Sequence, residues 1–270
     1  MQKLPVAAFR RAVYSHFAKA GRHLPWRKKV TPYRTFVSEI MLQQTQVPRA
    51  AEFFPRFIKR FPGWKRLAEA ELKEVLAVWQ GLGYNRRARF LHEAAKRVTG
   101  EFKGRLPDDP ALLATLPGIG KATAASIAAF GFNRPAVFIE TNIRAVFIHH
   151  YFPTRKSVTD ADLLPLVERA LDRKNPRRWY SALMDYGTAL KRLHGNPARR
   201  SAHHVRQPGF EGSSRQARGA LVRCLAASKR GMAVTALAKK TSLNENRTAE
   251  LLAALVKEGL VKERRGCFLL

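Results

Sequence analysis

Two acidic residues, Glu39 and Glu140, carry the strongest signal for chemistry because each stands in an apolar stretch of the sequence. Burial raises the pKa of a carboxyl group, and two acids in unlike surroundings can divide the roles of proton donor and anion. Breaking an N-glycosidic bond needs this division, because one group protonates the departing base while the other stabilises the positive sugar. Asn142 follows Glu140 closely and is placed to orient an acid or a sugar phosphate. The alternative for Glu140 is a structural ion pair with Arg144, one helical turn later.

A short glycine hairpin, Pro117-Gly118-Ile119-Gly120, precedes Glu140 in the chain. Such a hairpin turns backbone N–H groups outward at the start of a helix, where the helix dipole favours an anion. Gly118 and Gly120 permit the tight turn and the close approach of a phosphate. Lys121 follows at once, so we interpret the hairpin, with Thr123 beside it, as a contact for DNA phosphate. An ordinary glycine-terminated helix end is the alternative.

Glu39 is expected on a helix over residues 33–47, which begins at a Thr-Pro pair that is typical of a helix start. Its apolar face consists of Phe36, Val37, Ile40 and Met41. Glu39, Gln43 and Gln46 recur at helical spacing and share another stripe of the same helix. A carboxylate in line with carboxamides favours a functional face, and a solvated Glu-Gln stripe is the alternative.

A second cluster of candidate DNA contacts begins at Tyr84, where a glycine-rich turn leads into another helix. Arg86 and Arg87 stand in the first turn of that helix. Cations at a helix start oppose the helix dipole, so we expect an anion to compensate them there.

The overall charge of the 270-residue chain is +30, with a pI near 11.2, which indicates a polyanionic partner. No apolar run is long enough to span a membrane, and the N-terminus lacks a secretory pattern. Cys224 and Cys267 are the only cysteines, too few for an iron–sulfur cluster or a four-cysteine zinc site. The paired histidines do not complete a ligand set, so no metal site is expected. We therefore expect a cytoplasmic, nucleoid-associated monomer that binds double-stranded DNA and no membrane.

Three segments organise the chain. Residues 1–194 are helical throughout, residues 195–214 form a basic linker without periodicity, and residues 215–270 follow the helix and hairpin order of a winged helix. In that fold the third helix enters the major groove, which makes Asn244, Asn246 and Arg247 the candidates for base contacts. A protein-binding module of the same topology is the alternative.

Four motifs carry a resemblance to a known family. LPWRKKVTPYRTFVSEIMLQQTQV, WQGLGYNRRARFLHEAA, LPGIGKATAASI and SALMDYG occur in this order and cover about residues 10–192. Together they resemble the helix-hairpin-helix (HhH-GPD) DNA glycosylase superfamily and, within it, the adenine DNA glycosylases of the MutY type. SEIMLQQTQV together with GLGY…RAR is highly specific to that group.

The resemblance implies a mainly α, two-lobed glycosylase core that extrudes a nucleotide from the duplex and cleaves its base. Glu39 falls on the position of the family's general acid. The DNA-wedging segment falls on Gln43, Gln44, Thr45 and Gln46, and Tyr84 falls on an aromatic that inserts beside the opposing base. The hairpin falls on the phosphate-gripping motif, which often binds a monovalent cation, and Arg144 is counted as a further DNA contact.

Four departures from the family pattern shape the prediction. Glu140 followed by Thr141 stands where the family has a catalytic aspartate followed by glycine, so the acid reaches one methylene further. Ala122 occupies the position of the Schiff-base lysine in endonuclease III relatives, which argues against strand cleavage. Lys191 stands where the first cluster cysteine is expected, so no iron–sulfur cluster is predicted. The winged helix replaces the family's C-terminal Nudix-like domain.

The sequence thus predicts a monofunctional DNA glycosylase that hydrolyses the N-glycosidic bond of adenine mispaired with guanine or 8-oxoguanine. Mismatched thymine or uracil, or an alkylated or crosslinked base, is the alternative substrate within the same class. A non-catalytic DNA-binding protein on the same scaffold is the alternative from another class.

Overall fold

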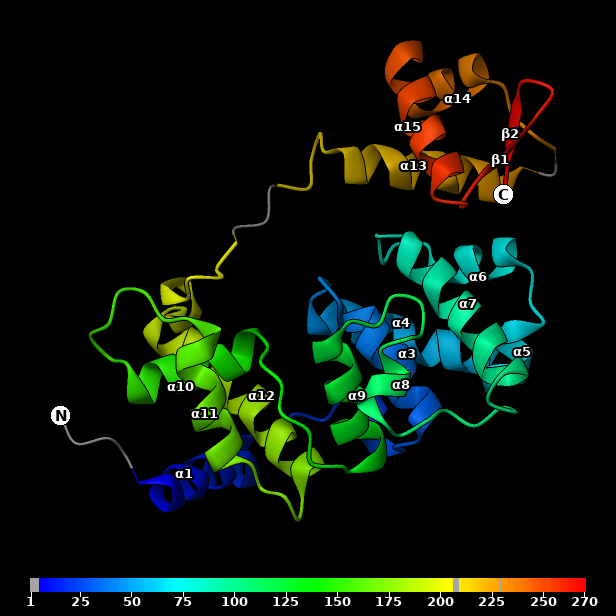
Figure 1. Ribbon diagram of the computed structural model, residues 1–270. Helices are drawn as coiled ribbons and strands as arrows, with labels where there is room; N and C mark the ends of the chain where they lie inside the picture. The colour runs from blue at the N-terminus through cyan, green and yellow to red at the C-terminus, as the bar shows by residue number, and fades with distance from the viewer. Residues whose placement is uncertain (1–4, 206–208, 229) are drawn as a thin grey trace. The chain divides into compact units, whose positions relative to one another are not determined.

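The computed structural model describes residues 5–205, 209–228 and 230–270, and these are mainly helical (Figure 1). The first helices are α1 (Val6–Ala20), α2 (Pro25–Lys28), α3 (Pro32–Leu42), α4 (Val47–Arg60), α5 (Trp64–Ala68), α6 (Leu72–Trp79), α7 (Arg86–Gly100) and α8 (Pro110–Leu113). They are followed by α9 (Lys121–Phe132), α10 (Thr141–Tyr151), α11 (Asp160–Ala170), α12 (Pro176–His194), the 3₁₀ helix η1 (Pro197–Arg200), α13 (Ser214–Ala227), α14 (Val234–Thr241) and α15 (Glu245–Lys257). The strands are β1 (Lys262–Arg264) and β2 (Cys267–Leu269). Within the described ranges, none of these helices combines the length and the apolar character needed to cross a bilayer.

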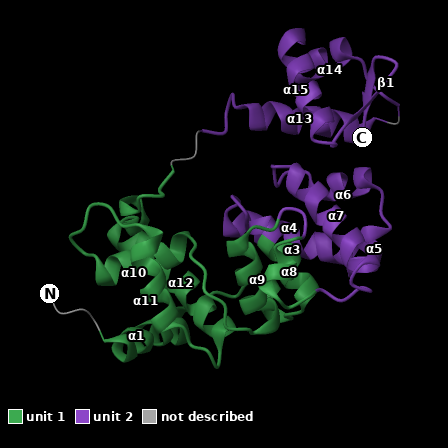
Figure 2. Cartoon of the chain, in the orientation of Figure 1, with its two compact units in different colours: residues 1–39, 107–115, 119–206 green, residues 40–106, 116–118, 207–270 purple. Residues whose placement is uncertain are grey.

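The chain divides into two compact units (Figure 2). Unit 1 comprises residues 1–39, 107–115 and 119–206, and unit 2 comprises residues 40–106, 116–118 and 207–270. Both candidate acids belong to unit 1, and the expected DNA-wedging segment belongs to unit 2.

The core of unit 1 is built around aromatic side chains from α1, α10 and α12. Phe9 of α1 lies 5.1 Å from Phe147, 5.4 Å from Tyr151 and 5.9 Å from Trp179, measured between ring centroids. Burying one such ring contributes about 1.5–3 kcal/mol relative to its exposure. This cluster holds α10 against α12, and these two helices carry the site described below.

The helix that carries Glu39 is shorter than predicted. The apolar face predicted for it is confirmed, because its four residues, Phe36, Val37, Ile40 and Met41, are fully buried. The predicted end at residue 47 is wrong, since α3 stops at Leu42 and Gln44 adopts a left-handed φ of 55°. Gln46 is instead the N-cap of α4, so it does not share a helical stripe with Glu39 and Gln43.

The C-terminal part of unit 2 has the predicted order of helices and strands. α14 ends at Thr241, and Ser242 after it adopts the left-handed conformation. The Asn244 side chain then caps α15 by accepting from the Arg247 N–H. β1 and β2 pair antiparallel around the predicted turn, with Lys262 opposite Leu269. Three helices followed by this hairpin form a helix-turn-helix domain with a short wing.

The predicted linker over residues 195–214 contains more structure than expected. Pro197–Arg200 form a 3₁₀ helix, and Ser201 pairs with Val158 in an isolated parallel bridge. Residues 206–208 of the predicted linker lie outside the described residues. α13 begins at Ser214, so the last predicted linker residue is already helical.

Candidate active site

Of the two candidate acids, Glu39 accepts fewer hydrogen bonds than Glu140. Its partly exposed side chain lies on α3, and its Oε2 accepts a hydrogen bond from Ser126 Oγ of α9 at 2.5 Å. Burial raises the pKa of Glu39 to about 7, against the lowering effect of the Ser126 bond. The negative charge of Glu140 raises the pKa of Glu39 further. Glu39 is therefore poised to hold a proton near neutral pH.

Glu140 occupies a contrasting environment at the N-terminus of α10. Its Oε1 accepts from the backbone N–H groups of Asn142 at 2.6 Å and Ile143 at 2.9 Å. Burial raises the pKa of Glu140 above its usual value, and the Ile143 N–H, the Lys191 charge and the Asn142 bonds each oppose this rise. N–H donors and a helix N-terminus stabilise a carboxylate, so Glu140 is the acid suited to bear the negative charge.

Asn142 connects Glu140 to α12. Its Nδ2 donates to Glu140 Oε2 at 3.2 Å, and its Oδ1 accepts from Lys191 Nζ at 2.8 Å. Gly187, one turn before Lys191 on α12, is buried beside this residue. A Cβ at position 187 would lie 2.6 Å from the backbone oxygen of Asn142. The absence of a side chain at Gly187 thus lets α12 approach α10 closely enough for Lys191 to reach Asn142.

Arg144 does not form the ion pair with Glu140 that the sequence left open. Its guanidinium donates instead to the two carboxylate oxygens of Asp160 at 2.8 and 2.7 Å. This bidentate pairing leaves Glu140 to its N–H donors, and the ion-pair interpretation of Glu140 is wrong. The assignment of Arg144 to DNA stays a prediction.

The prediction that Arg87 binds a DNA phosphate is wrong. Its side chain is buried, with 7% of the residue exposed, and it donates to the carbonyl oxygens of Ile40 at 3.0 Å and Met41 at 2.9 Å and to that of Gln43. A second nitrogen donates to Thr45 Oγ1 at 2.9 Å. Carbonyl groups at the end of α3 therefore compensate this cation, where the sequence suggested a DNA phosphate. Arg86, its neighbour, is exposed.

The expected DNA-wedging segment lies within unit 2 next to the first part of the hairpin. Gln43 Nε2 donates to the carbonyl oxygen of Gly118 at 3.1 Å, while Gln44 and Gln46 are exposed. Gly118 has a left-handed φ of 77°, as expected for the turn of a hairpin. Tyr84 is partly exposed, and its hydroxyl accepts from Arg215 at 2.7 Å.

The other predicted DNA contacts lie at helix starts. Gly120 is the N-cap of α9, Lys121 is exposed at its first position, and Thr123 is partly exposed. Asn246 and Arg247 are exposed in the first turn of α15. Their positions suit contact with a polyanion, and the contacts themselves stay predictions.

Comparisons with known proteins agree with this architecture. Residues 37–169 match the HhH-GPD superfamily of base excision DNA repair proteins, and residues 219–265 match the IclR helix-turn-helix domain. The chain is 34% identical over 229 residues to the adenine DNA glycosylase of Mycolicibacterium smegmatis, covering 77% of each protein. The chain belongs to the HhH-GPD superfamily of base excision DNA repair proteins.

Other relatives are matched over a smaller share of their length or at a lower identity. The chain is 39% identical to the adenine DNA glycosylase of Buchnera aphidicola subsp. Baizongia pistaciae over 68% of this chain and 52% of the relative. The chain therefore spans about half the length of the Buchnera relatives that it matches. The structure of a thermostable thymine-DNA glycosylase superposes with a TM-score of 0.63 at 22% identity, covering 71% of this chain and 90% of the other. At that identity the likeness extends to the fold alone.

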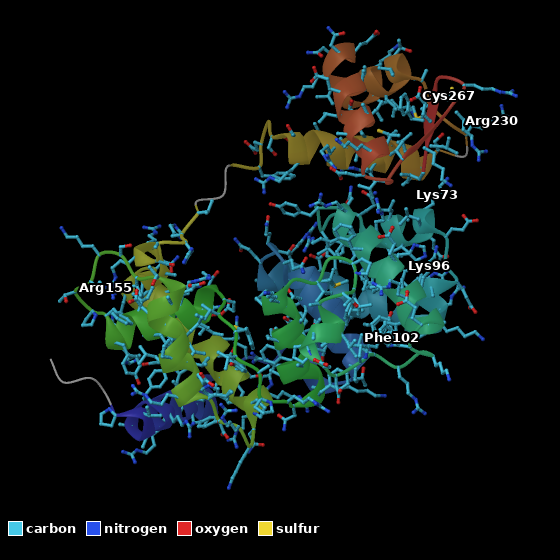
Figure 3. The ribbon with its side chains drawn as sticks, in the orientation of Figure 1. Lys73, Lys96, Phe102, Arg155, Arg230 and Cys267 are labelled. Atoms are coloured by element: carbon cyan, nitrogen blue, oxygen red, sulfur yellow. The ribbon has the colours of Figure 1, made fainter. Side chains whose placement is uncertain are left out.

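The donor set of this HhH-GPD chain does not fit an iron–sulfur cluster. Four thiolates are needed, and the sequence contains two cysteines. Cys224 lies in α13, and Cys267, labelled in Figure 3, lies in β2. The described residues also lack any group of three or more His, Cys, Asp and Glu side chains arranged to hold a metal ion.

Three residues of this site were not singled out as site residues in the sequence: Ser126, Gly187 and Lys191. Ser126 stands among alanines that we interpreted as helix-packing residues, and its single hydroxyl was the available signal. Lys191 was noted only as a replacement for a cysteine. Gly187 is the last residue of the motif SALMDYG, but its contact with Asn142 depends on how α12 packs against α10.

Gly187→Ala is expected to lower the free energy of unfolding by about 1–3 kcal/mol, because the new Cβ meets backbone atoms that cannot rotate away. The displaced Asn142 should also slow base release. Urea denaturation and a base-release assay measure the two effects. Gly219→Ala on α13 is the matched control, since a Cβ there meets nothing within 4 Å and alanine favours a helix by about 0.5–1 kcal/mol. Equal stability of the two variants would contradict this account of Gly187.

Proposed function

We propose that this protein is a base excision repair DNA glycosylase that hydrolyses the N-glycosidic bond of adenine mispaired with guanine or 8-oxoguanine. The observation that carries the proposal is the unlike hydrogen bonding of two neighbouring acids. Glu39 receives one hydroxyl donor, whereas Glu140 receives two backbone N–H groups and the Asn142 amide. The adenine DNA glycosylases among the relatives support adenine as the base.

The proposed reaction begins with protonated Glu39. Its carboxyl donates a proton to a ring nitrogen of the extruded base as the bond from that base to the sugar C1′ breaks. The bonding electrons leave with the base, and the carboxylate of Glu140 stabilises the positive charge that develops on the sugar. Ionised Glu39 then accepts a proton from water, whose oxygen bonds to C1′. The products are the free base and an abasic site, and Glu39 is protonated again.

The proposed enzyme is monofunctional. Cleavage of the strand by β-elimination requires a covalent bond between the abasic sugar and a lysine amine. By the resemblance to the endonuclease III relatives, Ala122 falls on the position of that lysine, and alanine carries no amine. Strand breaks are therefore expected only after treatment with alkali.

The helix-turn-helix domain is proposed to bind duplex DNA through the start of α15. A recognition helix presents its N-terminal residues to base edges in the major groove, and Asn246 and Arg247 are exposed at this place. The excess of positive charge over the whole chain supports a phosphate backbone as the partner.

A panel of duplexes tests the proposal. Adenine opposite 8-oxoguanine, adenine opposite guanine, thymine or uracil opposite guanine, and an alkylated base are incubated separately with excess protein, and free base is quantified by mass spectrometry. Adenine should be released from the first two duplexes, with strand breaks after alkali. Release of a different base alone would overturn the adenine assignment. Binding without release from any duplex would overturn the enzyme assignment.

A further inference from the structure

Lys191 is a charged residue of α12 that contacts Asn142 and acts on Glu140 through its charge. Its ammonium donates to Asn142 Oδ1 at 2.8 Å, and its charge lowers the pKa of Glu140. Burial lowers the pKa of Lys191 itself, the negative charge of Glu140 raises it, and the nearby Arg22 lowers it. Lys191 is partly buried, so its electrostatic interaction with Glu140 is less screened than an ion pair in water.

The chemistry of the lysine ammonium fixes the orientation of Asn142. An ammonium has three donors and no acceptor, so it bonds only to the oxygen of the Asn142 amide. With Oδ1 turned toward Lys191, the Nδ2 of the same amide is directed at Glu140 Oε2, 3.2 Å away. A side chain at position 191 without donors would leave the amide free to rotate and present its oxygen to the carboxylate.

The close packing of α12 against α10 allows the Lys191 side chain to contact Asn142. Gly187 and Lys191 are one helical turn apart and therefore share a face of α12. The close approach of Gly187 to the Asn142 backbone brings that face against the start of α10. The lysine is thus held in place by the packing of two helices as well as by its hydrogen bond.

From this geometry we propose that Lys191 is a positioning residue for cleavage of the glycosidic bond. It directs the Asn142 amide at Glu140 and supplies a positive charge that keeps Glu140 ionised while the sugar becomes positive. The proposal rests on the glycosylase function proposed above and assigns this lysine a role in that reaction. Lys191 touches neither the base nor the sugar in this account, because it acts through Asn142 and Glu140.

Three substitutions separate the effects of Lys191. Lys191→Met keeps most of the length and removes both donor and charge. Lys191→Gln keeps a donor without the charge, and Lys191→Arg keeps both. Arg192→Met is the matched control, because it removes an exposed charge from the next position of the same helix. Circular dichroism verifies that each variant is folded.

The measurement is the rate of base release from pH 5 to 9 with protein in excess, so that DNA affinity does not enter the rate. The probe is a duplex with adenine opposite 8-oxoguanine, or the duplex of the panel on which the unsubstituted chain is active. Lys191→Met should shift the acidic limb of the profile upward by about one pH unit and slow release about tenfold at pH 6, because Glu140 becomes harder to ionise. Lys191→Gln should show the same shift of the acidic limb with a smaller loss of rate at the plateau. The rate of base release by Lys191→Arg should lie within about threefold of the rate of the unsubstituted chain.

Two results would overturn the role of Lys191. One is a pH–rate profile of Lys191→Met that coincides with the profile of Arg192→Met. The other is a rate of base release that falls by the same factor at every pH, without a shift of the acidic limb. In both cases the unsubstituted chain still releases base, so the proposed function stands. If the unsubstituted chain releases no base from any duplex, the proposed function fails and the role of Lys191 fails with it.

Discussion

Glu39→Gln is expected to slow base release roughly 10³-fold, within the range of about 10²–10⁴ that general acid catalysis contributes. Glutamine has nearly the same shape and can still accept the Ser126 hydrogen bond, but its amide cannot deliver a proton to the departing base. The measurement is the rate of base release at pH 7 with protein in excess. Ser126→Ala is the control, because it removes the hydrogen bond and leaves the proton on Glu39. A Glu39→Gln rate within tenfold of the unsubstituted chain would contradict the role of Glu39.

The same substitution should stabilise the protein at alkaline pH. The pKa of Glu39 rises from 4.5 to about 7 on folding, so the folded protein holds this proton more tightly than the unfolded chain. The contribution of Glu39 to stability is present below pH 4.5 and is lost as the pH rises through 7. Glu39→Gln removes this loss and should raise the free energy of unfolding by about 2–3 kcal/mol at pH 8, with little gain at pH 5. Urea denaturation at both pH values checks the difference.

Asp185→Asn is expected to destabilise the protein by about 3–5 kcal/mol, because it removes the carboxylate that compensates two guanidinium groups. The Asp185 side chain is 1% exposed and lies 2.6 Å from Arg22 Nε and 2.8 Å from Arg27 Nη1. Burial alone would raise the pKa of Asp185, but the bonds from Arg27 and Arg22 bring it below its usual value. Asp185 therefore stabilises the fold above the usual carboxyl pKa and loses this effect on acidification.

An exposed ion pair provides the comparison for Asp185. Asp108 lies 2.5 Å from Arg134, but these side chains are 42% and 55% exposed. Solvent screens such a pair, so Asp108→Asn should cost less than about 1 kcal/mol. The free energies of unfolding of both variants are measured in urea at pH 7. A similarly small decrease in the free energy of unfolding of both variants would contradict the structural importance of Asp185.

Local patterns predicted many of the elements correctly. The bounds of α14 and the turn at Arg265 and Gly266 agree with the sequence because local signals mark them. The end of α3 had no such signal, since the nearest helix-breaking residue is Pro48. Arg87 satisfies the carbonyl groups at that end from another helix, so the helix can stop at Leu42 without a local cap.

The candidate site was predictable in its acids but not in the residues that distinguish them. Glu39 and Glu140 were identified from the apolar stretches around them. The donors to Glu140 are local to the start of α10, whereas the partner of Glu39 and the lysine that contacts Asn142 lie on other helices. Ser126 reaches Glu39 because α9 approaches α3, where Gly131 lies close to Thr35. Lys191 reaches Asn142 because α12 packs against α10. Such partners are distant in sequence, so spacing alone does not reveal them.

The pH dependence of base release by the unsubstituted chain tests the central claim most directly, namely that Glu39 donates a proton while Glu140 remains ionised. The duplex carries adenine opposite 8-oxoguanine, and the protein is in excess from pH 5 to 9. Because the pKa of Glu39 is raised to about 7, the rate should fall as the pH rises through 7, approaching about tenfold per pH unit beyond it. A rate that stays constant or increases between pH 7 and 9 would contradict the assignment of Glu39 as the proton donor.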